Sequence, residues 1–180
     1  MRNAVTRVGE ADITDRLVEA DDITSEMIRR MTAYLTRKRG DRLIAAREDI
    51  DPVELREFLP YMVLVDIQAK PLRVFYRLVG TRIAEFYGEF TGTWMHERQI
   101  SDAYRQIAEN IYRTLIETKA PVFGLTEMRT RYDAVVSYEW GYFPLSSDGV
   151  TVTGGLEIES PERRVIGVPP GLADAFVRGG

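Results

Sequence analysis

Strand-like segments in this sequence fall into two groups with helical sequence between them, and this order constrains the fold more than any other feature. "YMVLVDIQ", from Tyr61, and "RVFYRLVG", which ends at Gly80, are rich in β-branched and aromatic residues, and a "KP" turn joins them. Three more such segments follow at 122–129, 135–145 and 150–159. This grouping predicts an α+β fold with an antiparallel sheet and argues against alternating parallel βαβ units.

The long segment 135–145 carries aromatic side chains at alternating positions, so one face of this strand is expected to be aromatic. The "SSDG" that follows it is a hairpin signal, because Asp-Gly tolerates the positive φ of a tight turn. Arg77 and Glu139 interrupt their strands. Either they point to solvent or they pair with each other across the sheet, since an unpaired buried charge is costly.

Three helices are expected around the sheet. The first is amphipathic and runs from Thr24 to Gly40, and the others occupy 81–88 and 101–119. The apolar stripe of the first helix either covers the core or forms half of a two-fold interface, and we favour the interface. The residues of this predicted dimer interface are Met27, Ile28, Met31 and Leu35.

The chain has 180 residues, which is room for one domain of ordinary size. Residues 1–22 show no sustained period and are read as a flexible N-terminal arm or a loosely docked helix. Residues 23–160 form the domain, including its N-terminal helix. The tail 161–180 contains a proline pair and closing glycines, and is expected to be a peripheral C-terminal extension.

The composition excludes most familiar catalytic machinery. The sequence has no cysteine and one histidine, so disulfides, thiolate nucleophiles and a cysteinyl-flavin adduct are impossible, and no metal site is expected. The net charge of -4 gives no overall attraction to nucleic acid or anionic lipid. The first residues are too polar for a signal peptide and no run is long enough to span a membrane, so a cytoplasmic protein is expected.

A cluster of basic residues lies in and after the first predicted helix. We favour a solvated helix face with cations near its C-terminal end, where the helix dipole stabilises them, over a patch that binds an anion or a partner. The cluster consists of Arg29, Arg30, Arg37, Lys38, Arg39, Arg42 and Arg47.

The stretch "FYRLVGTRIAEFYG" passes directly from a strand into a short helix, an arrangement that often binds phosphate. Its glycines, with Gly92 beyond them, match neither a dinucleotide-binding fingerprint nor a P-loop, and no lysine follows in the required place. We therefore expect a plain turn, in which Gly80 closes the strand, Thr81 caps the helix and Gly88 ends it.

Taken together, these elements and short motifs resemble the PAS domain superfamily, and in particular the single-domain PAS family of alphaproteobacteria. The resemblance covers about residues 27–160. It implies a sensory or regulatory module with a five-stranded antiparallel sheet, helices on one face and an N-terminal helix through which members often dimerise, but no fixed ligand. The matching residues are Arg47, Asp49 to Pro52, Leu59, Pro60, Tyr76 to Leu78, Gly80, Thr81, Gly88, Thr91 and Gly92.

Aromatic residues are the candidates for a ligand site between sheet and helices. They either line such a cavity or form ordinary core and interface packing. His96 is considered as a haem ligand because some PAS domains hold haem through histidine, but a lone histidine favours a surface or capping role, and the cofactor stays unknown. The ligand-site candidates are Tyr76, Phe86, Trp94, Tyr112, Phe123, Tyr138 and Trp140.

Two functions are carried forward from the sequence. The preferred one is a non-enzymatic PAS module that forms a homodimer and binds a signalling protein. A small ligand in the cavity between sheet and helices can regulate this module. The alternative is a small α+β cone-fold isomerase or dehydratase with a carboxylate base and tyrosine donors. Its candidate residues are Asp66, Asp133 or Glu139, beside Tyr76 or Tyr138.

Overall fold

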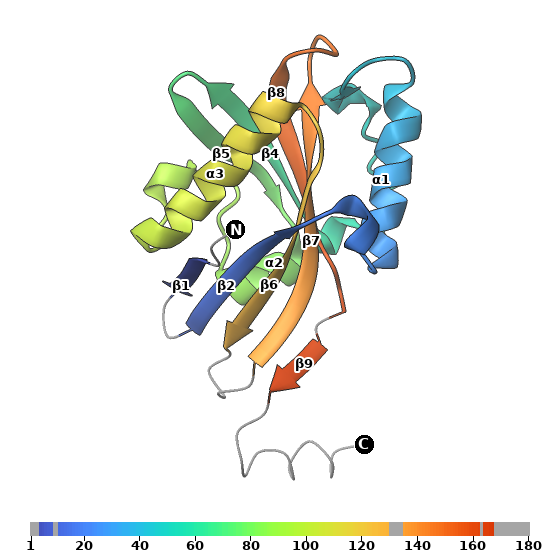
Figure 1. Cartoon of the computed structure of the whole chain (residues 1–180). Coiled ribbons are helices and arrows are strands. Elements are labelled where there is room, and N and C mark those ends of the chain that lie inside the picture. The colour runs from blue at the N-terminus through green and yellow to red at the C-terminus, as the bar shows by residue number, and fades with distance from the viewer. Residues whose placement is uncertain (1–3, 9–10, 130–134, 163, 168–180) are drawn as a thin grey trace.

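The computed structural model describes residues 4–8, 11–129, 135–162 and 164–167, and Figure 1 shows its arrangement. Its nine described strands form one sheet. Seven of them lie in the order β1-β2-β6-β7-β8-β4-β5, and the short strands β3 and β9 both pair with β7. The strands are β1 Ala4–Val8, β2 Ala11–Val18, β3 Ala45–Ala46, β4 Met62–Ala69, β5 Leu72–Val79, β6 Val122–Arg129, β7 Val135–Ser146, β8 Val152–Glu159 and β9 Arg164–Gly167. The helices are η1 Ala20–Asp22, α1 Glu26–Arg39, η2 Arg47–Asp49, η3 Leu59–Tyr61, α2 Thr81–Tyr87, η4 Met95–Glu97 and α3 Asp102–Thr118.

The predicted α+β fold with an antiparallel sheet is confirmed. The five expected strands lie in the order β6-β7-β8-β4-β5, and every pair among them is antiparallel. Only β3 runs parallel to its neighbour, β7. The two hairpin groups meet through the pairing of β4 with β8, which joins the first and the last strands of the domain into one sheet.

The N-terminal segment differs from its prediction. Instead of an arm or a loosely docked helix, its described residues form β1 and β2, and β2 pairs with β6 from Ile13 opposite Met128 to Val18 opposite Phe123. Because β2 lies between β1 and β6, its backbone hydrogen bonds come from partners on both sides, and β6 is far away in the sequence, so local periodicity did not reveal this strand. Part of the C-terminal extension also joins the sheet, as β9 beside the start of β7.

Helices cover both faces of the sheet (Figure 1). Helices α2 and α3 pack on one face over the inward residues of β4, β5 and β7. Helix α1 packs on the other face, over residues of β4, β7 and β8. The helices of the central segment thus share one face as expected, while the N-terminal helix takes the opposite one.

The apolar stripe of α1 is part of the core of its own chain, which corrects its assignment to a dimer interface. Ile28 and Met31 have no exposed surface, Leu35 is 5% exposed, and Met27 is half-buried against the same cluster. The prediction of a second copy rests on the position of the helix before the first of the five expected strands, where its stripe would be exposed if it did not fold back. In the fold the helix lies back across the sheet, so intramolecular packing covers it.

The N-terminus of α1 is held by a carboxylate from the sheet. Glu139 of β7 accepts hydrogen bonds from the backbone N–H groups of Thr24, at 3.0 Å, and Ser25, at 2.7 Å, and from the Thr24 hydroxyl at 2.7 Å. A negative charge at this position satisfies unpaired amide groups and complements the helix dipole. Glu139 therefore neither points to solvent nor pairs with Arg77, which instead pairs with Asp66 at 2.5 Å.

The turn between β5 and α2 depends on close backbone approach at Gly80. A Cβ atom there would lie 2.4 Å from the carbonyl oxygens of Leu59 and Pro60, so no larger residue fits. Gly80 itself precedes the helix and Thr81 is the first helical residue, which corrects the expected cap. Gly88 ends the helix with a φ of 82°, as predicted.

Candidate functional site

A polar cavity lies between α3 and the sheet face that α3 covers. Its volume is about 20 Å³, which is the room that a single water molecule requires. Helix α3 provides one wall, and side chains from β2, β6, β7 and β8 provide the other. The lining residues are Asp15, Tyr104, Ile107, Ala108, Ile111, Thr126, Tyr138, Trp140, Tyr142, Glu157 and Glu159.

A chain of hydrogen bonds crosses three strands at one side of this cavity. The indole Nε1–H of Trp140 on β7 donates to the hydroxyl of Thr126 on β6, at 2.9 Å, and this hydroxyl donates to the carboxyl of Asp15 on β2. The Trp140 ring lies directly over Gly124, where a Cβ atom would approach it to 2.0 Å. Because Gly124 has no side chain, the indole can lie flat across β6 and reach Thr126.

Two carboxyl groups of β8 face the same cavity. Glu157 and Glu159 occupy alternate positions, so both point toward α3, while Leu156 and Ile158 pack under α1. Burial raises the pKa of Glu157 to about 8, the nearby Glu159 adds to the rise, and a hydrogen bond with Tyr142 opposes it. Near neutral pH the Glu157 carboxyl is therefore largely protonated and able to donate a hydrogen bond.

Burial also raises the pKa of Asp15, although its bonds with Thr126 and Trp140 oppose this. Three acidic side chains thus face one cavity from two sides. The positive charge of Arg98 lowers the pKa of Glu157 and so acts against the burial effect. The guanidinium of Arg98 stacks on Phe90, 3.6 Å from the ring centroid, beside the cavity rather than in its lining.

The phenols around the cavity are neutral hydrogen-bonding groups. Burial raises the pKa values of Tyr87, Tyr104 and Tyr142 well above 10.0. Tyr87 of α2 shares a hydrogen bond between hydroxyl groups with Tyr138 of β7, which ties the short helix to the cavity wall. The cavity therefore presents carboxyl and phenol groups over an aromatic floor, a surface that can both donate hydrogen bonds to a small ligand and accept them from it.

The seven predicted ligand residues are only partly brought together. Tyr138 and Trp140 line the cavity, and Tyr112 packs behind it against Tyr142, with ring centroids 5.6 Å apart. The others lie elsewhere. Tyr76 is buried against Phe90, Phe86 is 50% exposed on α2, Trp94 packs on Phe75 at the edge of the sheet, and Phe123 lies on the α1 face.

Among the described residues proposed for the cone-fold alternative, Asp66 and Glu139 do not assemble into a common site. Asp66 forms surface ion pairs with Arg47, at 3.0 Å, and Arg77, while Glu139 binds the N-terminus of α1 on the opposite face. Asp133 lies outside the described residues. A carboxyl beside a tyrosine hydroxyl does occur in the cavity, but it belongs to Glu157 and Tyr142.

His96 is exposed on η4, with its ring 6.2 Å from that of Trp94. Within the described part of the chain, no group of three or more His, Cys, Asp or Glu side chains is arranged to hold a metal ion. No helix among these residues is both long and apolar enough to cross a membrane.

Most of the basic cluster is paired with carboxylates. Arg30 binds Glu57 at 2.5 Å and Lys38 binds Glu54 at 2.8 Å, while Arg29, Arg42 and Arg47 each form a similar ion pair. These exposed pairs add little stability but neutralise the field of the cations. The favoured reading of a solvated helix face accounts for Arg29, Arg30 and Lys38, while Arg42 and Arg47 lie after the helix and are paired there.

The carboxyl groups of the cavity were missed because their pattern is ambiguous in sequence. Glu157 and Glu159 alternate with Leu156 and Ile158, which is the pattern of a strand with one face in water. Here α1 and α3 cover both faces, so the polar face is internal. The available signal was the length of the helix 101–119, whose apolar stripe needs a sheet face to cover.

A comparison with known protein families matches residues 23–156 to the PAS domain family. The match spans most of the chain. The chain belongs to the PAS domain family, a class of sensory and regulatory modules. Comparisons with curated proteins and with solved structures gave no match.

Proposed function

We propose that this protein is a regulatory PAS module whose α3-side cavity responds to a small ligand and whose output passes through protein contacts of its N-terminal segment. The observation that carries the proposal is the series of hydrogen bonds from Trp140 through Thr126 to Asp15. These bonds connect the cavity to β2, and the polypeptide continues from β2 through η1 into α1. A change at the cavity therefore acts directly on the segment that leads to this helix.

The small size of the cavity supports this coupling. A ligand larger than a water molecule needs outward movement of a wall, since about 20 Å³ does not hold it. The movable walls are α3 and β2, because β7 and β8 lie in the centre of the sheet. Ligand binding would thus favour a state in which β2 is displaced, and the ligand's affinity for that state sets the size of the shift.

The experiment compares wild type with Thr126→Val, which keeps the shape of the side chain but removes the hydroxyl. Hydrogen–deuterium exchange should rise over residues 11–39 in the variant, because β2 loses its bond to the cavity wall. Thr153→Val, at an exposed position of β8, is the matched control and should leave exchange unchanged. Equal exchange over 11–39 in all three proteins would contradict the proposed route.

Native mass spectrometry of wild type reports any retained small molecule and the oligomeric state, so it also tests the expected homodimer.

A second function has one observation in its favour. The raised pKa of Glu157 beside the Tyr142 hydroxyl is the arrangement in which a carboxyl exchanges protons with a bound substrate. The cone fold itself is excluded by membership of the PAS family. Incubation of any retained molecule in D₂O separates the functions. Deuterium gain at carbon in wild type but not in Glu157→Gln indicates proton-abstraction chemistry, and absence of gain favours the regulatory role.

A further inference from the structure

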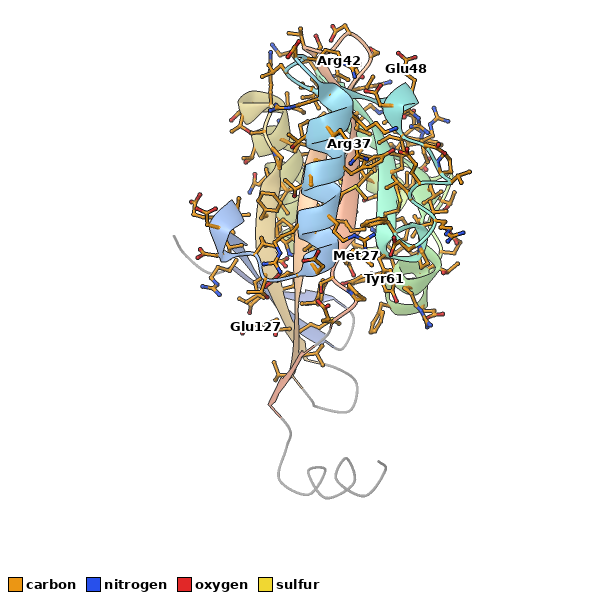
Figure 2. All side chains as sticks on the ribbon, turned by 90° about the vertical axis from the view of Figure 1, so that its right-hand side faces the viewer. Met27, Arg37, Arg42, Glu48, Tyr61 and Glu127 are labelled. Carbon is orange, nitrogen blue, oxygen red and sulfur yellow. The ribbon has the colours of Figure 1, made fainter. Side chains whose placement is uncertain are left out.

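A second hollow lies on the opposite face of the sheet, between α1 and the turn that joins α3 to β6. Its volume is about 450 Å³, within the range of roughly 300–1,000 Å³ that small-molecule sites occupy. Figure 2 shows α1 across the front of the sheet with β6 beside it. The lining residues are Ala20, Thr32, Leu35, Thr36, Arg39, Leu43, Ile44, Ala45, Thr118, Lys119, Ala120, Pro121, Phe123, Phe143 and Pro144.

The interior of this α1-side groove is apolar. Phe123 of β6 and Phe143 of β7 form an aromatic pair, with ring centroids 5.7 Å apart, and Leu35 of α1 belongs to the same cluster. Leu43 also lines the groove and is 50% exposed. An aliphatic ligand in the groove would cover this leucine and bury its own chain, with a gain of about 25 cal/mol for each Å² removed from water.

The charges of the groove are all positive. Arg39 and Lys119 are the only charged residues in its lining, and within the described part of the chain neither forms an ion pair. This distinguishes Arg39 from most of the basic residues of α1, which are neutralised by carboxylates. One Nη of Arg39 donates to the Leu43 carbonyl at 3.1 Å, and the guanidinium carries further donors suited to a carboxylate.

We propose that this groove binds an unbranched aliphatic monocarboxylate, a ligand of the fatty-acid type. The carboxylate lies at Arg39 and Lys119, and the hydrocarbon chain lies along Leu35, Phe123 and Phe143. The site is separate from the α3-side cavity and does not depend on the function proposed for it. Because α1 forms one wall, the bound chain adds apolar contacts to this helix and should slow its hydrogen exchange.

Calorimetric titration of the full chain with decanoate, below the concentration at which decanoate aggregates, tests the ligand class. We expect saturable binding with one site per chain. Octanoate should bind about 15-fold more weakly, because each methylene contributes about 0.8 kcal/mol, or a factor of about four. Decanol and decylamine have the same chain length without a negative charge, and each should bind at least about tenfold more weakly than decanoate.

A double variant locates the site. Arg39→Gln with Lys119→Gln should weaken decanoate binding by at least about tenfold and change decanol binding less than about twofold. The matched control is Arg37→Gln. Arg37 lies on the same helix, two residues away, with its guanidinium 5.5 Å from the centroid of the Tyr34 ring, and it does not line the groove. This control should bind decanoate as wild type does.

Three results would overturn the proposal. One is the absence of saturable decanoate binding, another is equal binding of decylamine, and the third is an equal loss of affinity in Arg37→Gln. Light scattering on the double variant identifies a different occupant. If its mass falls relative to wild type while decanoate does not bind, the groove is an interface between copies of this chain and not a fatty-acid site.

Discussion

At the scale of single residues, the carboxyl groups of β8 show how the surroundings decide chemistry. Glu157 and Glu159 lie two positions apart on a strand that is covered on both faces. Glu159 is buried and Glu157 is half-buried beside it, and this partial loss of water disfavours the charged form of Glu157. The same residues at the edge of an open sheet would be ordinary surface glutamates.

The pH dependence of the free energy of unfolding should reveal the raised pKa of Glu157. The pKa of Glu157 rises from 4.5 in the unfolded chain to about 8 in the folded protein, so the folded state retains a proton that the unfolded state releases. The contribution of Glu157 to the free energy of unfolding therefore falls as pH rises through this interval. Glu157→Gln should match wild type near pH 4.5 and be more stable by about 1–3 kcal/mol at pH 8.5.

Urea unfolding of both proteins across this pH interval measures the difference. Glu48→Gln, at an exposed position labelled in Figure 2, is the control and should follow the wild-type curve. A difference between Glu157→Gln and wild type that stays constant with pH would show that the proton of Glu157 is not involved.

At the scale of elements, α1 is placed by two separate interactions. Its apolar stripe packs on the sheet, and the two residues just before its first turn, Thr24 and Ser25, are bound by the carboxylate of Glu139. The stripe fixes which face of the helix is buried, but it does not fix the position of the helix along its axis. Glu139 supplies this second restraint, because it contacts only the residues at the N-terminus.

Removing the charge of Glu139 should loosen this end of the helix. Glu139→Gln loses a charge-assisted cap and should lower the free energy of unfolding by about 1–2 kcal/mol. Hydrogen exchange should increase in the first two turns of α1 and less toward Arg39. Glu26→Gln is the control, since Glu26 lies in the same turn but forms only an exposed ion pair with Arg29, worth less than about 1 kcal/mol. Equal effects of the two substitutions would mean that general charge at the helix end, and not the tertiary contact, matters.

At the scale of the whole molecule, the sheet separates two hydrophobic clusters. One lies under α2 and α3 and contains the polar cavity, and the other lies under α1 beside the apolar groove. The helix that was expected to pair with a second copy completes the second cluster within one chain. The homodimer stays a prediction, and any interface it has must use surface other than the buried part of this stripe.

Met31→Ala distinguishes an intramolecular core from an interface. Met31 has no exposed surface, so truncation should leave a cavity and lower the free energy of unfolding by about 2–4 kcal/mol. The mass measured by size-exclusion chromatography with light scattering should equal that of wild type. A fall from dimer to monomer with little change in stability would show that Met31 is an interface residue and not part of the core of one chain.

Local sequence by itself determined the main elements of the central domain and their order. The segments that became β4 to β8 and the three main helices were all recognisable, because side-chain periodicity and turn residues act over a few neighbouring positions. The short motifs around Gly80 also indicated the family. Alternation placed Tyr138 and Trp140 on one face of β7, and in the fold this face borders the cavity, while their role as ligand residues stays a prediction.

Tertiary structure alone decided what each face meets. It paired β2 with the open edge of β6, so that Asp15 joined the cavity, and it folded α1 over its own sheet. It also placed Phe123 on the face opposite Trp140, although both are aromatic strand residues. These outcomes depend on contacts between segments far apart in the chain, and periodicity within one segment shows which residues share a face but not what covers that face.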